Sequence, residues 1–402
     1  MTWQTILYNL VAQELKRHGV ESWLLHLDCL DIRRIEAAAD GNSLHHGEST
    51  CLSLGLWWGE RLISLSFLVM PDRIQDIPER VAASIEGLST AAFQGGPAQS
   101  APRWNQGTWN GWEGDWNSLA DRWRPQLVKS LSGKGTGVQQ LTLSLERRDL
   151  LLRDHEMRTR QVTRYATRLV ILCRGGPKGR GTWTMTVPFP TPELRDLAPH
   201  IKRAMRHARL RACRTSHAPG TGPILLQPTA LAQLLTTVMA SEETGGRANA
   251  EFLPDGVLHS PSTYMDDLGF PVDLRSVDSH KGVMRFSHRA ALPAPALDQL
   301  WIRPGRGPTR RARAGSLTIW HLDELLPGSL HKRFVMIVSG EVVTSNASRD
   351  VSRLRLDIPW RAVKSALLDP ARRGPSPLAI HFGETDYYVP SLCLGEFSWA
   401  PL

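Results

Sequence analysis

The stretch PILLQPTALAQLLTTVMASEETGG, from Pro223 to Gly246, decides how the second half of the chain is interpreted. Ile224–Leu226 is a short apolar run and predicts a strand. Thr229–Ser241 predicts a helix, which Glu242–Gly246 ends. The sequence therefore places a strand directly before a largely apolar helix.

The chain beyond this helix predicts a β-rich domain. Short apolar runs recur there between Gly, Pro and Asp residues, which is typical of strands joined by turns. These predicted strands are Val272–Val277, Gly282–Ser287, Gln299–Arg303, Leu317–Leu322, Phe334–Ser339 and Leu378–Phe382. We therefore expect a C-terminal β-rich domain over residues 223–402.

The chain before Pro223 predicts an α+β domain over residues 1–214, with an antiparallel sheet and helices packed on it. Helices are expected at 2–19, 72–93, 118–131 and 191–214. Strands are expected at 23–27, 31–36, 50–58, 61–70, 138–146, 160–173 and 182–187, with a turn at Gly41–Gly47. Residues 215–222, TSHAPGTG, read as a linker between the domains.

Residues 95–117 form a segment rich in Gly, Pro, Asn and Trp, which predicts a long loop without a regular element. Its tryptophans offer either a stacking surface or apolar anchors. Anchoring is favoured, because apolar side chains are what keep a long loop ordered.

Composition bounds the class of protein. The 402 residues are 41% hydrophobic and 22% charged, enough to bury cores in two or three domains. The five cysteines are scattered and none forms a CxxC pair, which excludes a disulfide framework or a zinc ribbon. Without an export signal or a long apolar run, the pattern indicates a cytoplasmic protein with no membrane span.

Basic charge is concentrated in one region. Residues 121–214 hold 21 Lys and Arg against 7 Asp and Glu, while the whole chain has a net charge of +9. Such an excess suits nucleic-acid binding. No recognised nucleic-acid module accompanies it, however, so a solvated face or one that docks an acidic partner or peptide is favoured.

The sequence lacks several familiar catalytic motifs. The chain has no phosphate loop and no nucleophile elbow. His155-Glu156 is not followed by a second histidine one helical turn later, as a zinc peptidase of the HExxH type requires. His45-His46 falls in the predicted glycine-flanked turn, where adjacent side chains diverge, and this disfavours a metal site.

Three segments after the helix, in this order and spacing, give the chain a recognisable pattern. They are Asp266-Asp267-Leu268-Gly269-Phe270-Pro271, then Lys281-Gly282-Val283-Met284, and Leu300-Trp301-Ile302-Arg303-Pro304-Gly305. Together with the strand and helix at 223–246, they resemble the C-terminal domain of the TldD/PmbA (TldD/TldE) metallopeptidase family. The resemblance implies a TldD/PmbA-type fold for that domain.

The family's active subunits carry HExxxH on this helix, and the present chain departs from that motif. Thr236 and Thr237 stand at the positions of the first histidine and the glutamate, and Ser241 stands at the second histidine. Neutral hydroxyls do not hold Zn²⁺, and threonine cannot act as a general base near neutral pH. Active subunits also use a late cysteine, but Leu392 and Leu394 around Cys393 favour a packed thiol.

The resemblance therefore implies a TldE-like subunit that has no catalytic residue, metal or cofactor of its own. Its partner would be a TldD-like HExxxH subunit that holds zinc, in a heterodimer acting on unfolded peptides. One such substrate would be the leader of a modified-peptide precursor. Residues proposed for the peptide or partner cleft are Tyr264, Asp266, Asp267, Gly269, Pro304 and Gly305.

Two alternatives stay open at this point. One is a basic nucleic-acid-binding protein, which the charge of residues 121–214 suggests. The other is an independent hydrolase without zinc that uses Asp266, Asp267, His280 or His288. The sequence Asp-Asp-Leu-Gly is also typical of a turn whose Asp side chains cap backbone amides, and this structural interpretation is the stronger.

Overall fold

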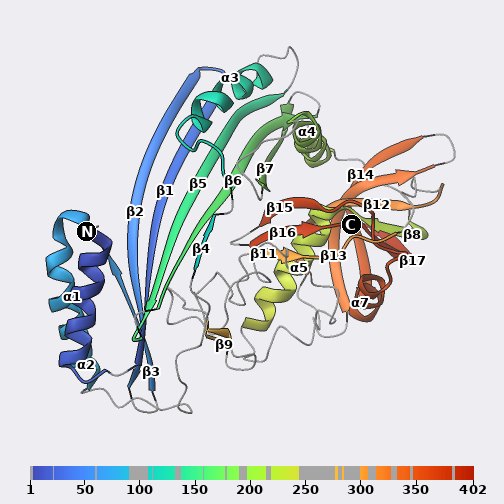
Figure 1. Ribbon diagram of the computed structural model, residues 1–402. Helices are drawn as coiled ribbons and strands as arrows, with labels where there is room; N and C mark the ends of the chain where they lie inside the picture. The colour runs from blue at the N-terminus through green and yellow to red at the C-terminus, as the bar shows by residue number, and fades with distance from the viewer. Residues whose placement is uncertain are drawn as a thin grey trace.

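The fold was determined as a computed structural model. It describes residues 3–20, 22–58, 61–89, 107–110, 112–131, 137–156, 158–176, 179–189, 197–213, 219–243, 277–278, 283–284, 299–306, 314–326, 333–344, 347–382 and 385–402. Figure 1 shows a long curved sheet in the first half of the chain and a barrel in the second, with the N-terminus and C-terminus at opposite sides of the molecule.

Seven strands form the long sheet, in the order β3-β2-β1-β5-β6-β4, with β7 also paired to β6. The strands are β1 (Ser22–Ala38), β2 (Gly41–Trp58), β3 (Arg61–Leu68), β4 (Gly107–Asn110), β5 (Val138–Asp154), β6 (Thr159–Gly175) and β7 (Gly181–Phe189). β1, β5 and β6 are each 17 residues long. A sheet built on them extends over roughly 55 Å.

Two pairs of helices cover the two ends of this sheet (Figure 1). α1 (Trp3–Arg17) and α2 (Ile77–Ser89) pack on one end, and a 3₁₀ helix η1 (Pro71–Asp76) leads into α2; α3 (Leu119–Leu131) and α4 (Ala198–Ala212) pack at the other end. A helix of 15 residues is only about 22 Å long, so one layer cannot cover the whole sheet. The sheet therefore has two separate hydrophobic cores.

The second half of the chain contains a closed barrel in the order β12-β13-β14-β17-β8. Its elements are β8 (Gly220–Leu226), β12 (Leu317–Leu326), β13 (Arg333–Val343), β14 (Ser348–Pro359) and β17 (Leu392–Pro401), with α7 (Trp360–Leu368) after β14. Phe334 inside the barrel is 1% exposed, and its ring meets Trp360 of α7 edge-on with centroids 5.3 Å apart. The barrel is thus filled by side chains.

The helix α5 (Pro228–Glu243) leaves the barrel after β8 and lies beside a small three-stranded sheet (Figure 1). That sheet has the order β11-β16-β15, from β11 (Gln299–Trp301), β16 (Thr385–Val389) and β15 (Leu378–Phe382). Two further two-residue strands, β9 (Val277–Asp278) and β10 (Val283–Met284), pair with each other. α5 is the helix predicted from Thr229–Ser241, extended at both ends.

Three sequence predictions are corrected here. The segment predicted as a loop holds the strand β4, which pairs in parallel with β6, because an edge position needs only a few residues of extended backbone. The predicted turn at Gly41–Gly47 is the start of β2, and the actual turn precedes Gly41. β8 begins at Gly220, inside the segment predicted as a linker.

Within the residues that the structure describes, no helix has the length and apolar character that crossing a membrane requires.

Candidate functional site

The residues that replace the zinc motif lie on α5, where the helix passes from the barrel core to the three-stranded sheet. Leu234 and Leu235 are fully buried and hold this part of the helix in the barrel core. Thr236 and Thr237 follow and are half-buried. Ser241 lies in the last turns of the same helix, and its side chain is outside the described residues.

Both threonine hydroxyls are engaged in hydrogen bonds. Thr237 donates to the carbonyl oxygen of Gln233 at 3.0 Å. Thr236 Oγ1 lies 2.8 Å from the carbonyl oxygen of Ala232 and 2.8 Å from the hydroxyl oxygen of Tyr387, a fully buried residue of β16. A threonine hydroxyl carries one hydrogen, so both bonds form together only when the tyrosine hydroxyl also donates.

This donor set does not suit a zinc ion. Zn²⁺ in proteins takes imidazole nitrogen, thiolate sulfur or carboxylate oxygen as ligands. Thr236 and Thr237 offer neutral hydroxyl oxygens, and these already bond the helix backbone and Tyr387. Thr236 therefore links α5 to the three-stranded sheet, whereas Thr237 bonds only its own helix.

Pro304 and Gly305 lie three and four residues after the end of β11, against the turn at 370–374. Pro304 is exposed, and the amide of Gly305 donates to the carbonyl oxygen of Gly374 at 3.0 Å. A Cβ atom at Gly305 would stand 2.1 Å from the carbonyl oxygen of Pro370. Glycine is therefore required at this position by the close approach of two backbones.

Arg373 is a buried cation in the same turn. The residue is 6% exposed, and its Nε and Nη1 atoms have no hydrogen-bond partner among the described residues. Burial lowers the pKa of its guanidinium, the charge of Arg303 lowers it further, and Asp369 opposes the change. The turn that holds this desolvated guanidinium packs directly against Gly305.

Other predicted site residues are not brought together by the described parts of the chain. Tyr264, Asp266, Asp267 and Gly269 lie outside the described residues, as do His280 and His288. Cys393 lies on β17 and is half-buried, on the opposite strand face from the buried Leu392 and Leu394. Its thiol lies 3.5 Å from the carbonyl oxygen of Leu394.

A buried histidine pair joins the long sheet's helix α4 to the barrel. His207 of α4 and His321 of β12 are both fully buried, with Nδ1 atoms 3.4 Å apart. His207 Nε2 lies 3.3 Å from the hydroxyl of Thr229 on α5, and Trp183 stacks on the His207 ring at 4.8 Å. Burial lowers the pKa of His207 well below its ordinary value, and the charges of His321 and nearby arginines act in the same direction.

The pair continues toward a carboxylate. His321 Nε2 lies 3.1 Å from Asp323, which also accepts a hydrogen bond from Ser339. Burial raises the pKa of Asp323, but the hydrogen bonds from His321 and Ser339 and the charges of His321 and Arg211 leave it below its ordinary value. Sequence analysis did not find this network, because its histidines are 114 residues apart and fit no motif.

A group of side chains that could serve as metal ligands lies on the surface of the long sheet. Within the described ranges, Asp31, His46 and Glu48 form the group whose ligand atoms all lie within 4.8 Å of one another. β1 and β2 place Asp31 directly opposite Glu48. Asp31 also accepts a bond of 2.7 Å from Trp116 Nε1 and lies 3.7 Å from Arg33. These contacts explain why the three side chains lie together: they pair across β1 and β2, and Asp31 anchors the indole of Trp116.

Solved structures with the same architecture include TldE from Thermococcus kodakarensis, with a TM-score of 0.67 at 10% sequence identity, covering 98% of this chain and 99% of that one. The chain has the TldE fold. Putative modulators of DNA gyrase from Bacteroides thetaiotaomicron and Thermotoga maritima share it, with TM-scores of 0.64 and 0.62, each at 13% identity and 99% coverage of this chain. They are covered over 99% and 100% of their own lengths.

The predicted α+β fold of the TldD/PmbA type is thereby confirmed. No protein-family model and no curated protein matches the sequence. The TldE fold is thus shared at a sequence identity of only 10–13%.

Proposed function

We propose that this chain is a non-catalytic, TldE-like subunit of a heterodimeric zinc peptidase. Its partner is a subunit of similar fold that bears HExxxH and holds the zinc ion. The pair cleaves unfolded peptides, among which the leader of a modified-peptide precursor is a candidate. This chain completes the substrate cleft and excludes water from it.

The observation that carries the proposal is the bonding of Thr236 and Thr237 on α5. Their hydroxyls are used by carbonyl oxygens of the same helix and by Tyr387. Neither residue can activate water, because an alcohol does not take up a proton near neutral pH. The fold shared with TldE supports the assignment to the partner type.

The three-stranded sheet beside α5 supports a role in holding peptide. Among the described residues, β11 is an edge strand of this sheet, and an extended peptide can add to such an edge through main-chain hydrogen bonds with little sequence preference. Pro304 and Gly305 follow β11, and the buried Arg373 stands in the adjoining turn. We place the contact with peptide or partner here.

Nucleic-acid binding is less well supported by the same structure, because much of the basic charge of α4 is already paired. Arg206 bonds Glu341 at 2.9 Å and Asp350 at 3.2 Å, and Arg209 lies 3.1 Å from Asp350. An arginine that is already paired with a carboxylate neutralises a phosphate less well than an unpaired arginine, so it releases fewer counterions from the nucleic acid.

Co-expression with an HExxxH-bearing subunit of the same fold tests the proposal. The two chains should co-purify, and the complex should cleave a fluorescently labelled unfolded peptide in a chelator-sensitive reaction. Each chain alone should be inactive. Thr237→Ala should leave the rate of the complex unchanged, because this hydroxyl serves only its own helix.

Two arginine variants locate the contact. Arg373→Gln should lower the activity of the complex or its assembly, whereas Arg361→Gln on the exposed side of α7 should change neither. The proposal fails if this chain alone cleaves the peptide, or if Thr237→Ala abolishes cleavage by the complex while the complex still assembles.

A further inference from the structure

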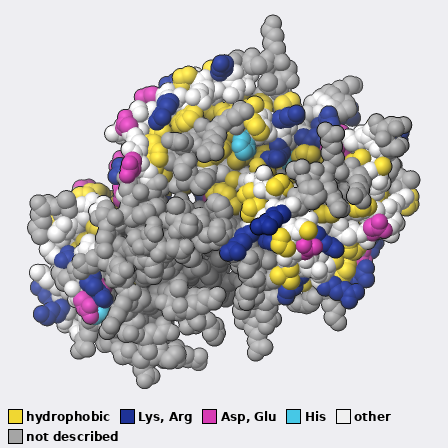
Figure 2. Space-filling view, turned by 45° about the vertical axis from the view of Figure 1, so that its right-hand side comes forward, with side chains coloured by type: hydrophobic (Ala, Val, Ile, Leu, Met, Phe, Trp, Pro, Cys, Tyr) yellow, Lys and Arg dark blue, Asp and Glu magenta, His cyan; other side chains and the backbone are white. Residues whose placement is uncertain are grey.

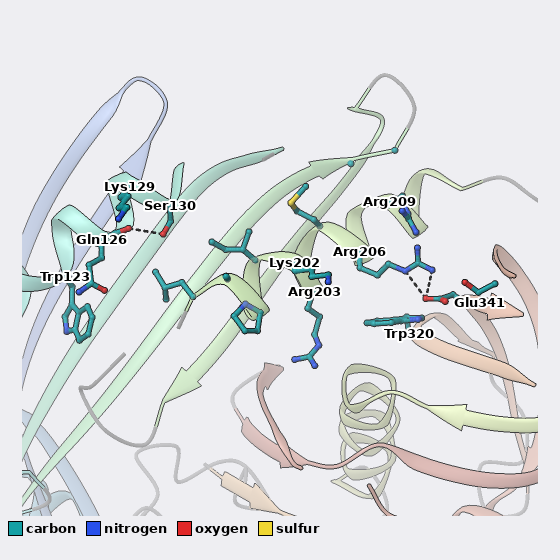
Figure 3. Close-up of a pocket in the computed structure, with 18 residues that line it drawn as sticks. Trp123, Gln126, Lys129, Ser130, Lys202, Arg203, Arg206, Arg209, Trp320 and Glu341 are labelled. Atoms are coloured by element: carbon teal, nitrogen blue, oxygen red, sulfur yellow. Dashed lines mark hydrogen bonds and ion pairs between the residues drawn. The ribbon is translucent and has the colours of Figure 1, made fainter. Parts of the chain in front are cut away.

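A pocket of about 1410 Å³ lies where the long sheet meets the barrel. Its walls come from α3, α4 and the barrel strands β12 and β13 (Figure 3). In Figure 2, Lys and Arg side chains lie among hydrophobic ones in the upper right part of the molecule, where the sheet approaches the barrel. The pocket exceeds the usual range of small-molecule sites, about 300–1,000 Å³, and suits a segment of several residues.

The lining is strongly cationic. It contains Lys129 of α3 and Lys202, Arg203, Arg206 and Arg209 of α4. Its single acidic member among the described residues is Glu341, and this carboxylate is already bonded to Arg206. The pocket therefore carries excess positive charge.

Two of these cations have no ion-pair partner among the described residues. Lys202 is exposed, and Arg203 is half-buried. Figure 3 shows Arg203 extending from α4 toward the barrel, into the space beside Trp320. Burial lowers the pKa of Arg203, so its charge stands in a partly dry environment that a bound carboxylate would stabilise.

The remaining lining includes several apolar residues beside the polar Gln126, Ser130 and Ser348. Leu197, Ile201 and Met205 come from the segment of α4 that also carries the cations, and Trp123 comes from α3. Cations alone would suit any anion in solution. Cations above an apolar floor suit a ligand that presents acidic and apolar side chains together.

The aromatic residues of the pocket argue for a peptide over a nucleic acid. Single-stranded nucleic acids bind by stacking bases on open aromatic faces. Here Arg206 lies over the Trp320 ring at 5.8 Å, and Trp123 is 6% exposed. Neither ring offers an open face to a base.

We propose that this pocket binds an acidic peptide segment with interspersed apolar residues. Its Asp or Glu carboxylates pair with Arg203 and Lys202, and its apolar side chains lie on the partly buried Ile201 and Met205. The site lies wholly within this chain, so it can be tested without a partner subunit, and its failure would leave the proposed function standing.

Fluorescence anisotropy of the full chain with a labelled peptide of mixed Glu and Leu residues tests the proposal. The same peptide with Gln in place of Glu is the neutral control, and labelled single-stranded DNA is the nucleic-acid arm. We expect the acidic peptide to bind, with an affinity that falls as salt rises. The neutral peptide should bind at least about tenfold more weakly.

Matched variants locate the site. Arg203→Gln and Lys202→Gln should each weaken binding of the acidic peptide, by about tenfold for Arg203, while Arg361→Gln on α7 removes the same charge without effect. Lys202 is exposed, so its variant does not endanger folding. Equal binding of both peptides, equal losses from all three variants, or displacement of the peptide by DNA as the tighter ligand would overturn the proposal.

Discussion

Changing His207 to glutamine should remove part of the pH dependence of folding. Burial lowers the pKa of His207 in the folded chain, and the charges of His321, Arg203, Arg206 and Arg211 lower it further. In the unfolded chain the imidazole regains its ordinary pKa of about 6.5. Below that pH the imidazole binds a proton in the unfolded chain but stays neutral in the folded chain. The free energy of unfolding therefore falls as pH falls.

The magnitude follows from one proton. A group with an unfolded pKa of about 6.5 that stays neutral in the folded state lowers the unfolding free energy by about 1.4 kcal/mol between about pH 7.5 and pH 5.5. The loss ends when the pH reaches the lowered pKa of the folded state. Facing groups on the other elements are Thr229 of α5, Trp183 of β7, and His321 with Asp323 behind it on β12.

Urea unfolding followed by tryptophan fluorescence at several pH values measures this effect. His207→Gln should be less stable than the unchanged chain near neutral pH but should lose less stability on acidification. His45→Gln, at an exposed position on β2, should keep the full dependence. An NMR titration should place the imidazole pKa of His207 well below the ordinary histidine value of about 6.5. If His207→Gln loses as much stability on acidification as the unchanged chain, the reasoning is refuted.

Three further substitutions test the packing around the candidate site and the barrel. Phe334→Ala should lower the free energy of unfolding by about 3–5 kcal/mol, because the ring is 1% exposed and packs on Trp360. If the urea midpoint shifts as little as it does for a surface substitution, Phe334 does not belong to the barrel core. Gly305→Ala should lower the free energy of unfolding by about 1–3 kcal/mol, because its Cβ would stand 2.1 Å from the carbonyl oxygen of Pro370. An unchanged melting temperature would disprove this close approach of the two backbones. Tyr387→Phe removes a hydroxyl 2.8 Å from Thr236 Oγ1 and should lower the free energy of unfolding in urea by about 1 kcal/mol. The zinc content of the chain should not change. A gain of zinc would show that Thr236 and Thr237 do take part in a metal site.

The order of elements could be predicted from sequence wherever periodicity was strong. Helix α5 follows from the apolar pattern of Thr229–Ser241, and β15 follows from Leu378–Phe382. β1 is continuous where the sequence predicts separate strands at 23–27 and 31–36, and the residues between them, 28–30, are half-buried. They lie between the two pairs of helices, where no helix among the described residues packs on the sheet.

The start of β2 was missed for a different reason. The hairpin turn is Ala39-Asp40, because Ala38 already pairs with Gly41 across the two strands. Gly41 itself has a positive φ of 152°. The turn was instead assigned to the polar residues after it, including His45 and His46. Polar side chains are tolerated there because nearly every residue from 41 to 49 is exposed, on both faces of the strand.

The contacts at the junction could not have been found from sequence. His207 meets His321, and Arg206 meets Glu341 and Asp350, through pairings that only the docking of α4 on the barrel creates. Their residue types alone indicate a basic helix and an ordinary strand. The threonines of α5 were identified because a known motif assigns a role to each of their positions.

Zinc content of the purified chain tests the central claim most directly. The chain should bind no stoichiometric zinc after expression without a partner, and peptide cleavage should be absent. His46→Ala removes the surface cluster of Asp31, His46 and Glu48, so any zinc lost in that variant belongs to the sheet surface. Stoichiometric zinc that survives in His46→Ala, together with chelator-sensitive cleavage by the chain alone, would contradict the account.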